Sequence, residues 1–150
     1  MNARLVAIVA AAGAVAVSAV PASAAPKTIK QTYAVEAPVP FPVMEDQPPT
    51  MYGCIDGQEG LSKVTREITL PAPGLFKAEV TYTGDWDLYL MDTNGAILAS
   101  SETVETGNVN PSSEKLSWKK AKKGQKVNLV VCNWMGLKDA TVTYTHTYAK

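Results

Sequence analysis

The sequence predicts an all-β protein: an antiparallel, jelly-roll-like sandwich of about seven to eight strands with one disulfide. Three observations predict this fold class. Short runs alternate between apolar and polar residues, turn-forming residues separate the runs, and no window after residue 26 carries the apolar stripe of a helix. A chain of 150 residues has room for one ordinary domain.

The first 24 residues have the features of a secretory signal peptide. Arg4 supplies a positive charge, an uncharged apolar run follows over 5–17, and Ala22-Ser23-Ala24 has the small-residue pattern that signal peptidase reads. A spanning helix needs about 20 apolar residues, so this run is short for a membrane span. We therefore expect residues 1–24 to be removed and the protein to be secreted. An uncleaved membrane anchor is the alternative.

Residues 25–50 are expected to form a proline-rich linker or arm. Six of the ten prolines lie in this stretch, and proline removes backbone donors and favours extended conformations. Thr32–Val35 is compatible with a short edge strand. Residues 38–42 alternate proline with an apolar residue and cannot join a central ladder.

The domain expected over residues 51–150 contains the predicted strands. The clearest is 75–82, where apolar and polar residues alternate with a period of two, and 142–148 alternates in the same way. Residues 127–134 are nearly continuously apolar, which is typical of a central strand buried on both faces. The remaining predicted strands are 64–70, 87–91, 96–99 and 115–118. The predicted core comprises Ile68, Leu70, Phe76, Val80, Leu88, Leu90, Ile97, Leu98, Val127, Leu129, Val131, Val142 and Tyr144.

Turn residues separate these runs at regular intervals. Asn94-Gly95 between two apolar runs is a strong signal for a tight hairpin, because both residues tolerate a positive φ. Pro71-Ala72-Pro73-Gly74 and Lys123-Gly124 mark two further turns. Short strands at turn-marked spacing favour a sandwich over a parallel sheet.

Export changes how the two cysteines are interpreted. In an oxidising compartment, Cys54 and Cys132 are expected to form a disulfide. Neither belongs to a C-x-x-C motif, which leaves little support for a zinc or thioredoxin-like site. The bridge would close a loop of about 79 residues and stabilise the fold by at most about 4.5 kcal/mol. Two reduced, buried cysteines are the alternative.

The formal net charge of zero conceals an uneven distribution. Thirteen of the 14 acidic residues lie between positions 31 and 114, whereas eight of the 14 lysines and arginines follow position 114. This split predicts that one end of the fold is basic. It does not argue for nucleic acid as a partner, because exported proteins rarely meet it and arginine is scarce here.

The stretch Gly84-Asp85-Trp86-Asp87-Leu88-Tyr89-Leu90-Met91-Asp92-Thr93-Asn94-Gly95, continuing to Ser101, carries a family resemblance. It resembles the bacterial pre-peptidase C-terminal domain, a β-sandwich appended to secreted peptidases and other exported proteins. The segments 73–80 and 123–131 match flanking strands of that pattern, and the likeness covers roughly residues 60–148. The resemblance implies a sandwich fold and a non-catalytic, accessory or binding role.

Two departures from the family pattern narrow what the resemblance implies. Domains of this family usually follow a catalytic domain, and nothing catalytic precedes residue 51. The pair Cys54 and Cys132 is also foreign to the general pattern. Together these features suggest a free-standing exported relative, of the kind found among actinobacterial hypothetical proteins.

Four oxygen-bearing side chains suggest a calcium site. Asp85 and Asp87 alternate with apolar residues, so their carboxylates leave the strand on one face. Asp92 and Asn94 lie in a segment that resembles the start of an EF-hand loop, although Thr103 stands where that loop needs an acidic residue. In the alternative interpretation, Asp92 and Asn94 are turn formers and Asp85 caps a bulge, and no cofactor is bound.

An extracellular polymer or a component of the cell envelope is the expected partner of a binding domain. Trp86 and Trp118 are candidate stacking platforms for sugars, and Trp134 and Tyr89 are further candidates. The candidate contacts to an anionic polymer are Lys119, Lys120, Lys122 and Lys123. The alternatives are that the aromatic rings belong to the core and that the lysines keep a turn solvated and protect it from edge pairing.

Catalysis is not predicted. His146 is the single histidine, it lies in a threonine-rich strand, and no G-x-S-x-G or comparable nucleophile motif is present. The sequence therefore predicts a non-catalytic binding or accessory domain, with a calcium-stabilised structural module as the alternative. A small secreted hydrolase, or a protease inhibitor using the loop over 101–113, remains a further alternative.

Overall fold

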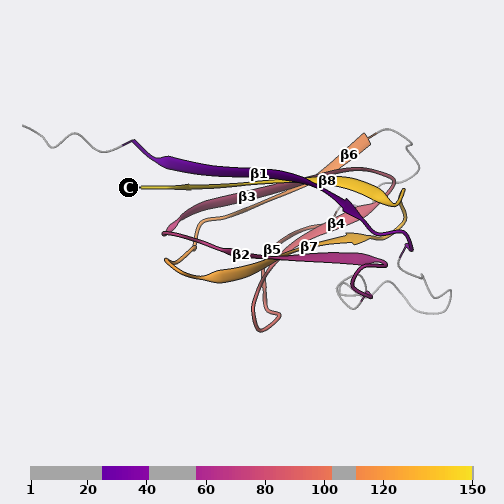
Figure 1. Cartoon of the computed structure of the whole chain (residues 1–150), viewed down its shortest axis with the longest axis horizontal. Coiled ribbons are helices and arrows are strands. Elements are labelled where there is room, and N and C mark those ends of the chain that lie inside the picture. Colours follow the sequence, from indigo (N-terminus) through magenta and orange to yellow (C-terminus); the bar gives the residue numbers. More distant parts are fainter. Residues whose placement is uncertain (1–24, 41–56, 103–110, 150) are drawn as a thin grey trace, which may run out of the picture.

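The computed structural model describes residues 25–40, 57–102 and 111–149, in which two four-stranded sheets pack face to face (Figure 1). The first sheet has the order β1-β8-β3-β6, and the second has the order β2-β7-β4-β5. Neighbouring strands are antiparallel throughout. The strands are β1 (Lys27–Glu36), β2 (Lys63–Thr69), β3 (Gly74–Thr83), β4 (Trp86–Asp92), β5 (Ile97–Ser101), β6 (Pro111–Trp118), β7 (Lys126–Asn133) and β8 (Asp139–Tyr148). The predicted all-β, antiparallel sandwich is confirmed.

The connections between strands run mostly from one sheet to the other. Only β4 and β5, which form a hairpin, are consecutive strands of the same sheet, so six of the seven connections cross between the sheets, as in a jelly roll. The end of the sandwich at the left of Figure 1 carries the β2–β3 turn and the β6–β7 loop. The start of β1 and the end of β8 lie at the same end, where Lys27 pairs with Tyr148.

The core lies between the two sheets. Inward-facing side chains of β3 and β4, such as Phe76, Val80 and Leu88, have no exposed surface. The predicted core is confirmed except at Ile97, which is 38 % exposed, and at Leu98, which is only partly buried. The cause is a bulge opposite the end of β4, where β5 carries one extra residue and its side chains lose the regular alternation.

A second, smaller cluster covers the outer face of the second sheet. Tyr89 and Met91 of β4 pack there with Val130 and Cys132 of β7, and Trp134 lies against them. The prediction that this strand is buried on both faces is therefore confirmed for β7. Burial raises the pKa of the Cys132 thiol. Its predicted disulfide partner, at position 54, lies outside the described residues, so the bridge stays a prediction.

Strand β1 is longer than the sequence suggested. The region expected to form a linker or arm was compatible with a short edge strand at Thr32–Val35, whereas Lys27–Glu36 pairs with β8 along its whole length. No proline interrupts these ten residues, because the prolines cluster after position 37. Beyond β1, the N–H of Ala37 donates to the carbonyl of Lys138 at 2.8 Å. The sandwich therefore begins at β1, and residues 41–50 of the expected linker lie outside the described residues.

The side-chain amide of Asn133 joins several segments at the end of the sandwich opposite the β2–β3 turn. Its Nδ2 donates to the carbonyl of Ala37 at 2.8 Å, and its Oδ1 accepts from the N–H of Gly136 at 2.8 Å. Trp86 Nε1 donates to the carbonyl of Leu137 at 3.1 Å. A Cβ at Gly136 would lie 2.7 Å from Trp86 Nε1, so this close approach requires glycine.

The expected signal peptide, residues 1–24, lies outside the described residues. In the ranges that the structure describes, no helix has the length and apolar character needed to cross a bilayer.

Candidate functional site

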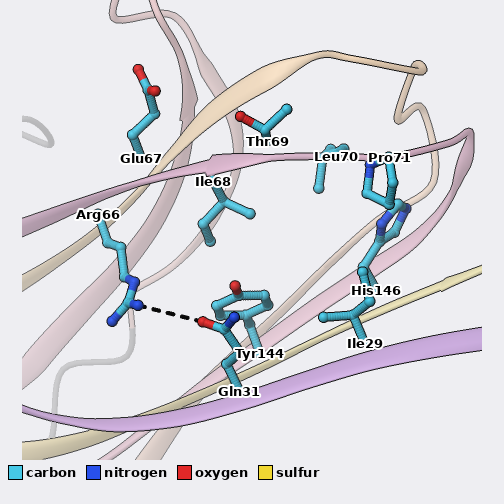
Figure 2. Close-up of a pocket in the computed structure, with 10 residues that line it drawn as sticks. All are labelled: Ile29, Gln31, Arg66, Glu67, Ile68, Thr69, Leu70, Pro71, Tyr144 and His146. Carbon is cyan, nitrogen blue, oxygen red and sulfur yellow. Dashed lines mark hydrogen bonds between the residues drawn. The ribbon is translucent and has the colours of Figure 1, made fainter.

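A cavity of about 280 Å³ lies between the two sheets where β1 and β2 form their edges (Figure 2). These edge strands belong to different sheets and are not paired with each other, so the sandwich is open along this side. The walls come from β1 (Ile29 and Gln31), from β2 and the turn after it (Arg66, Glu67, Ile68, Thr69, Leu70 and Pro71), and from β8 (Tyr144 and His146). We call this cavity the β1–β2 groove.

The alternation of β2 decides which of its side chains face the groove. Figure 2 shows Arg66, Ile68 and Leu70 directed toward β8 and β1, whereas Glu67 and Thr69 point to the other side of the strand. Glu67 forms an ion pair with Lys126 on that outer side, with its Oε1 2.7 Å from Lys126 Nζ. The inner wall contributed by β2 is therefore apolar apart from one guanidinium.

Arg66 connects the two edge strands. Its guanidinium carbon lies 4.2 Å from the centroid of the Tyr33 ring, and its Nη2 donates to Gln31 Oε1 at 3.4 Å. Burial raises the pKa of Tyr33 to about 12, and the nearby Arg66 charge opposes this rise. The pKa of Tyr144 is raised in the same way, again against the Arg66 charge. Arg66 takes part in none of the ion pairs formed by the described residues.

His146 lies at the other end of the groove and is only 1 % exposed. Among the described residues, neither ring nitrogen has a hydrogen-bond partner, although the ring packs against Tyr148 with centroids 5.2 Å apart. Burial lowers the pKa of His146, so at neutral pH the ring is uncharged and offers one donor and one acceptor. A buried polar group left without a partner costs about 1–3 kcal/mol. A polar group entering the groove would recover this energy.

Gly74 makes room for the histidine. A Cβ at this position would lie 2.9 Å from His146 Nε2 and 2.9 Å from Tyr148 Cβ, and still closer to the carbonyl oxygen of Thr147. The first residue of β3 must therefore be glycine for His146 to keep its place.

The four lysines predicted to contact a polymer are brought together in one loop. They are Lys119, Lys120, Lys122 and Lys123, and all four are exposed in the β6–β7 loop. The ion pairs of the described residues involve other lysines, at positions 115, 126 and 138. We call these four residues the lysine loop.

Backbone hydrogen bonds hold the lysine loop in place. The N–H of Gly124 donates to the carbonyl of Leu70, and the N–H of Leu70 donates to the carbonyl of Gln125, both at 2.8 Å. Gly124 adopts a φ of 72°, and Gln125 Oε1 accepts from the N–H of Lys122 at 3.0 Å. The loop is therefore fixed to the end of β2, beside the β1–β2 groove.

The tryptophans predicted as stacking platforms lie in the core. Trp86 has no exposed surface and Trp118 is 8 % exposed, and both belong to the cluster between the sheets. The two further candidates are also covered, since Tyr89 is buried and Trp134 is half-buried in the outer cluster. The interpretation of Trp86 and Trp118 as surface platforms must be corrected, because inward alternation places both rings between the sheets.

The four residues predicted to bind calcium do not converge on one point. Asp85 and Asp87 lie at the start of β4, whereas Asp92 and Asn94 lie at its far end, about 16 Å away at 3.3 Å per residue. Asp92 Oδ1 accepts the N–H groups of Asn94 at 2.8 Å and of Ala96 at 2.9 Å, which is the role of a turn former. Within the described ranges no group of three or more His, Cys, Asp or Glu side chains is placed to hold a metal. Calcium binding stays a prediction, and one ion could contact either Asp85 and Asp87 or Asp92 and Asn94, but not all four residues.

Acidic groups gather around Asp87 instead. Burial, together with the nearby carboxylates of Asp85 and Glu102, raises its pKa to about 7. The hydroxyl of Tyr89 donates to Asp87 Oδ2 at 3.3 Å and partly offsets this rise. Asp87 pairs with Cys132 near the end of β7, whereas the lysine loop precedes β7, so the two lie at opposite ends of the sandwich. Asp92, however, pairs with Val127 beside the lysine loop, and Lys138 forms an ion pair with Glu36, so the charge split in the sequence does not divide the fold into one acidic and one basic end.

No protein-family model matches the chain, and no curated protein matches it significantly. The likeness to the pre-peptidase C-terminal domain therefore stays a prediction.

Sequence reasoning missed the β1–β2 groove. The alternation of 142–148 placed Tyr144 and His146 on one face, but nothing indicated that Arg66, 80 positions earlier than His146, would lie opposite them. The inhibitor alternative rested on the loop over 101–113, most of which lies outside the described residues.

Proposed function

We propose that this chain is an exported, non-catalytic binding or accessory domain that holds an anionic polymer of the cell envelope or the extracellular space at its lysine loop. The observation that carries this proposal is the set of four exposed ammonium groups, at positions 119, 120, 122 and 123. None of them takes part in the ion pairs of the described residues.

The position of the lysine loop favours contact with a large partner. The loop connects strands of different sheets at one end of the sandwich, while the carboxylates around Asp87 lie at the opposite end. A polyanion approaching the lysine loop therefore meets positive charge without passing those carboxylates.

A non-catalytic role agrees with the surroundings of the single histidine. Among the described residues, the lining of the groove that His146 faces includes no serine and no cysteine. Its ring nitrogens also have no carboxylate partner among the described residues, whereas a serine–histidine site needs one to orient the ring. The resemblance to accessory domains of secreted peptidases supports the same role.

Co-sedimentation tests the proposal. The purified protein is mixed with cell walls, chitin, cellulose or collagen at low and at high salt, and the pelleted fraction is measured. We expect salt-sensitive pelleting with cell walls, because contacts between exposed charges are screened over about 10 Å at ordinary ionic strength. Replacing the four loop lysines by Gln should abolish it.

A matched pair of variants separates the loop from net charge. Lys122→Gln/Lys123→Gln and Lys30→Gln/Lys77→Gln each remove two exposed positive charges, but the second pair comes from strands β1 and β3. Only the first pair should weaken pelleting. Equal pelleting by the quadruple variant and the unaltered protein would refute the proposal, as would pelleting that resists high salt.

A further inference from the structure

We propose that the β1–β2 groove is a second binding site, separate from the lysine loop, which takes a small organic anion: a carboxylate carried by a short apolar group. The proposal rests on three features of the groove, namely its donors, the buried imidazole at its end and its apolar wall.

The polar groups that face the groove are suited to an anion. Arg66 contributes a guanidinium whose only polar side-chain contact among the described residues is the amide oxygen of Gln31, at 3.4 Å. Tyr144 contributes a hydroxyl from the neighbouring wall. Glu67, the one carboxylate among the lining residues that the structure describes, points away and pairs with Lys126. A guanidinium without a carboxylate partner is the side chain best suited to a planar, two-oxygen anion.

His146 is the independent observation that points to a ligand. Its ring is 1 % exposed, is directed from β8 toward the turn after β2 and lines the groove. Neither nitrogen has a hydrogen-bond partner among the described residues. The uncharged ring has one N–H to donate, and a carboxylate oxygen or a ligand hydroxyl would accept it. No side chain in the described ranges accepts this proton.

The remaining wall selects an apolar substituent. Ile29, Ile68, Leu70 and Pro71 line the groove between its polar groups. A volume of about 280 Å³ lies just below the usual range of ligand pockets, roughly 300–1,000 Å³. It suits a branched acid of a few carbons. A free short-chain acid and the C-terminal residue of a peptide share this chemistry.

The experiment uses His146 as its own reporter, because it is the only histidine of the chain. The imidazole carbon-bound proton of the purified protein is followed by NMR during titration with isovalerate, its neutral analogue isovaleramide, inorganic phosphate, and a leucine-terminated dipeptide with a free or amidated C-terminus. We expect a saturable shift with isovalerate and none with isovaleramide or phosphate. A shift with the free dipeptide in addition would assign the source to peptide ends, and its absence would assign it to free acids.

Two variants connect the shift to the proposed donors. Arg66→Gln removes a charged hydrogen bond worth about 1.5–3 kcal/mol, so isovalerate should bind roughly 10- to 100-fold more weakly. Tyr144→Phe removes only the hydroxyl and keeps the ring that stacks on Phe76 at 5.5 Å, so it should weaken binding while preserving the fold. Lys30→Gln, a charge removed from the exposed side of β1, should bind isovalerate unchanged.

Several results would overturn the proposal. One is an imidazole signal that no probe moves. Another is an equal response to isovaleramide, which would remove the need for an anion, or to phosphate, which would remove the need for the apolar wall. Unchanged affinity in both the Arg66→Gln and Tyr144→Phe proteins would also refute it. The lysine-loop variants should respond to isovalerate like the unaltered protein, so failure of the polymer proposal and failure of this one are distinguishable.

Discussion

Replacing Asp87 by Asn should stabilise the protein more at pH 8 than at pH 5. Burial and the neighbouring carboxylates Asp85 and Glu102 raise the pKa of Asp87 from 3.8 to about 7. The folded protein therefore holds a proton that the unfolded chain has already released. Because the folded-state pKa is the higher one, the resulting stability is complete at low pH and is lost as the pH rises toward 7. Asn cannot titrate, and its side-chain oxygen can still accept from the Tyr89 hydroxyl, which lies 3.3 Å from the carboxylate.

The expected size follows from the same pKa. The free energy of unfolding changes by 1.36 kcal/mol for each pH unit between the two pKa values, which gives at most about 3 kcal/mol between pH 5 and pH 7. Asp87 is only partly buried, and solvent near a partly exposed group reduces such an effect, here to about 1.5 kcal/mol. The measurement is the free energy of unfolding in urea at pH 5 and pH 8. Asp139→Asn, at an exposed position on β8, is the control. An Asp87→Asn effect of equal size at both pH values would refute the electrostatic account.

Three further predictions concern the corner, the cysteines and the histidine. Asn133→Ala should lower the free energy of unfolding by about 3 kcal/mol, because it leaves the Ala37 carbonyl and the Gly136 N–H without their amide partner. The control Asn128→Ala, on the same strand, should cost far less. Equal losses in the two variants would contradict the role of the Asn133 amide in joining these segments. Mass spectrometry under non-reducing conditions should show the Cys54–Cys132 bridge, and replacing both cysteines should cost up to about 4.5 kcal/mol; two alkylatable thiols in the untreated protein would exclude it. The NMR titration midpoint of His146 should lie below the usual 6.5, since burial opposes its charged form; a midpoint at or above 6.5 would show that the ring is not desolvated as described.

The fold was largely predictable because the pattern of apolar and polar residues in each strand indicates which of its faces are buried. The alternation in 75–82 and 142–148 reports one buried face, and the continuous apolar run at 127–134 reports two. Turn chemistry supplied the boundaries, as at Gly95 and Gly124, where a positive φ is in fact adopted. Strand β1 was underestimated because seven of its ten residues are exposed and polar or small, and the prolines after it dominate the local composition.

The sites were less predictable because they depend on contacts between distant segments. The lysine loop could be recognised, since its members are adjacent in the sequence. The β1–β2 groove could not, because it needs residues from β1, β2 and β8 that only the sheet order brings together. At Trp86 and Trp118, by contrast, the sequence predicted a site that the structure does not have. Aromatic rings suggested a surface role by residue type, whereas the direction of their side chains places them inside.

The pairing of β1 with β8 has a mechanical consequence. Lys27 lies opposite Tyr148, so the outer ends of these two strands are neighbours at one end of the sandwich. A force that separates these two points loads the ladder at that end, and its antiparallel hydrogen bonds then break one pair after another. The outer end of β1 would peel away first and take Ile29 and Gln31 with it, before Val35 near the other end of the strand leaves the core. Tension along this line would therefore dismantle the β1–β2 groove while most of the sandwich stayed folded.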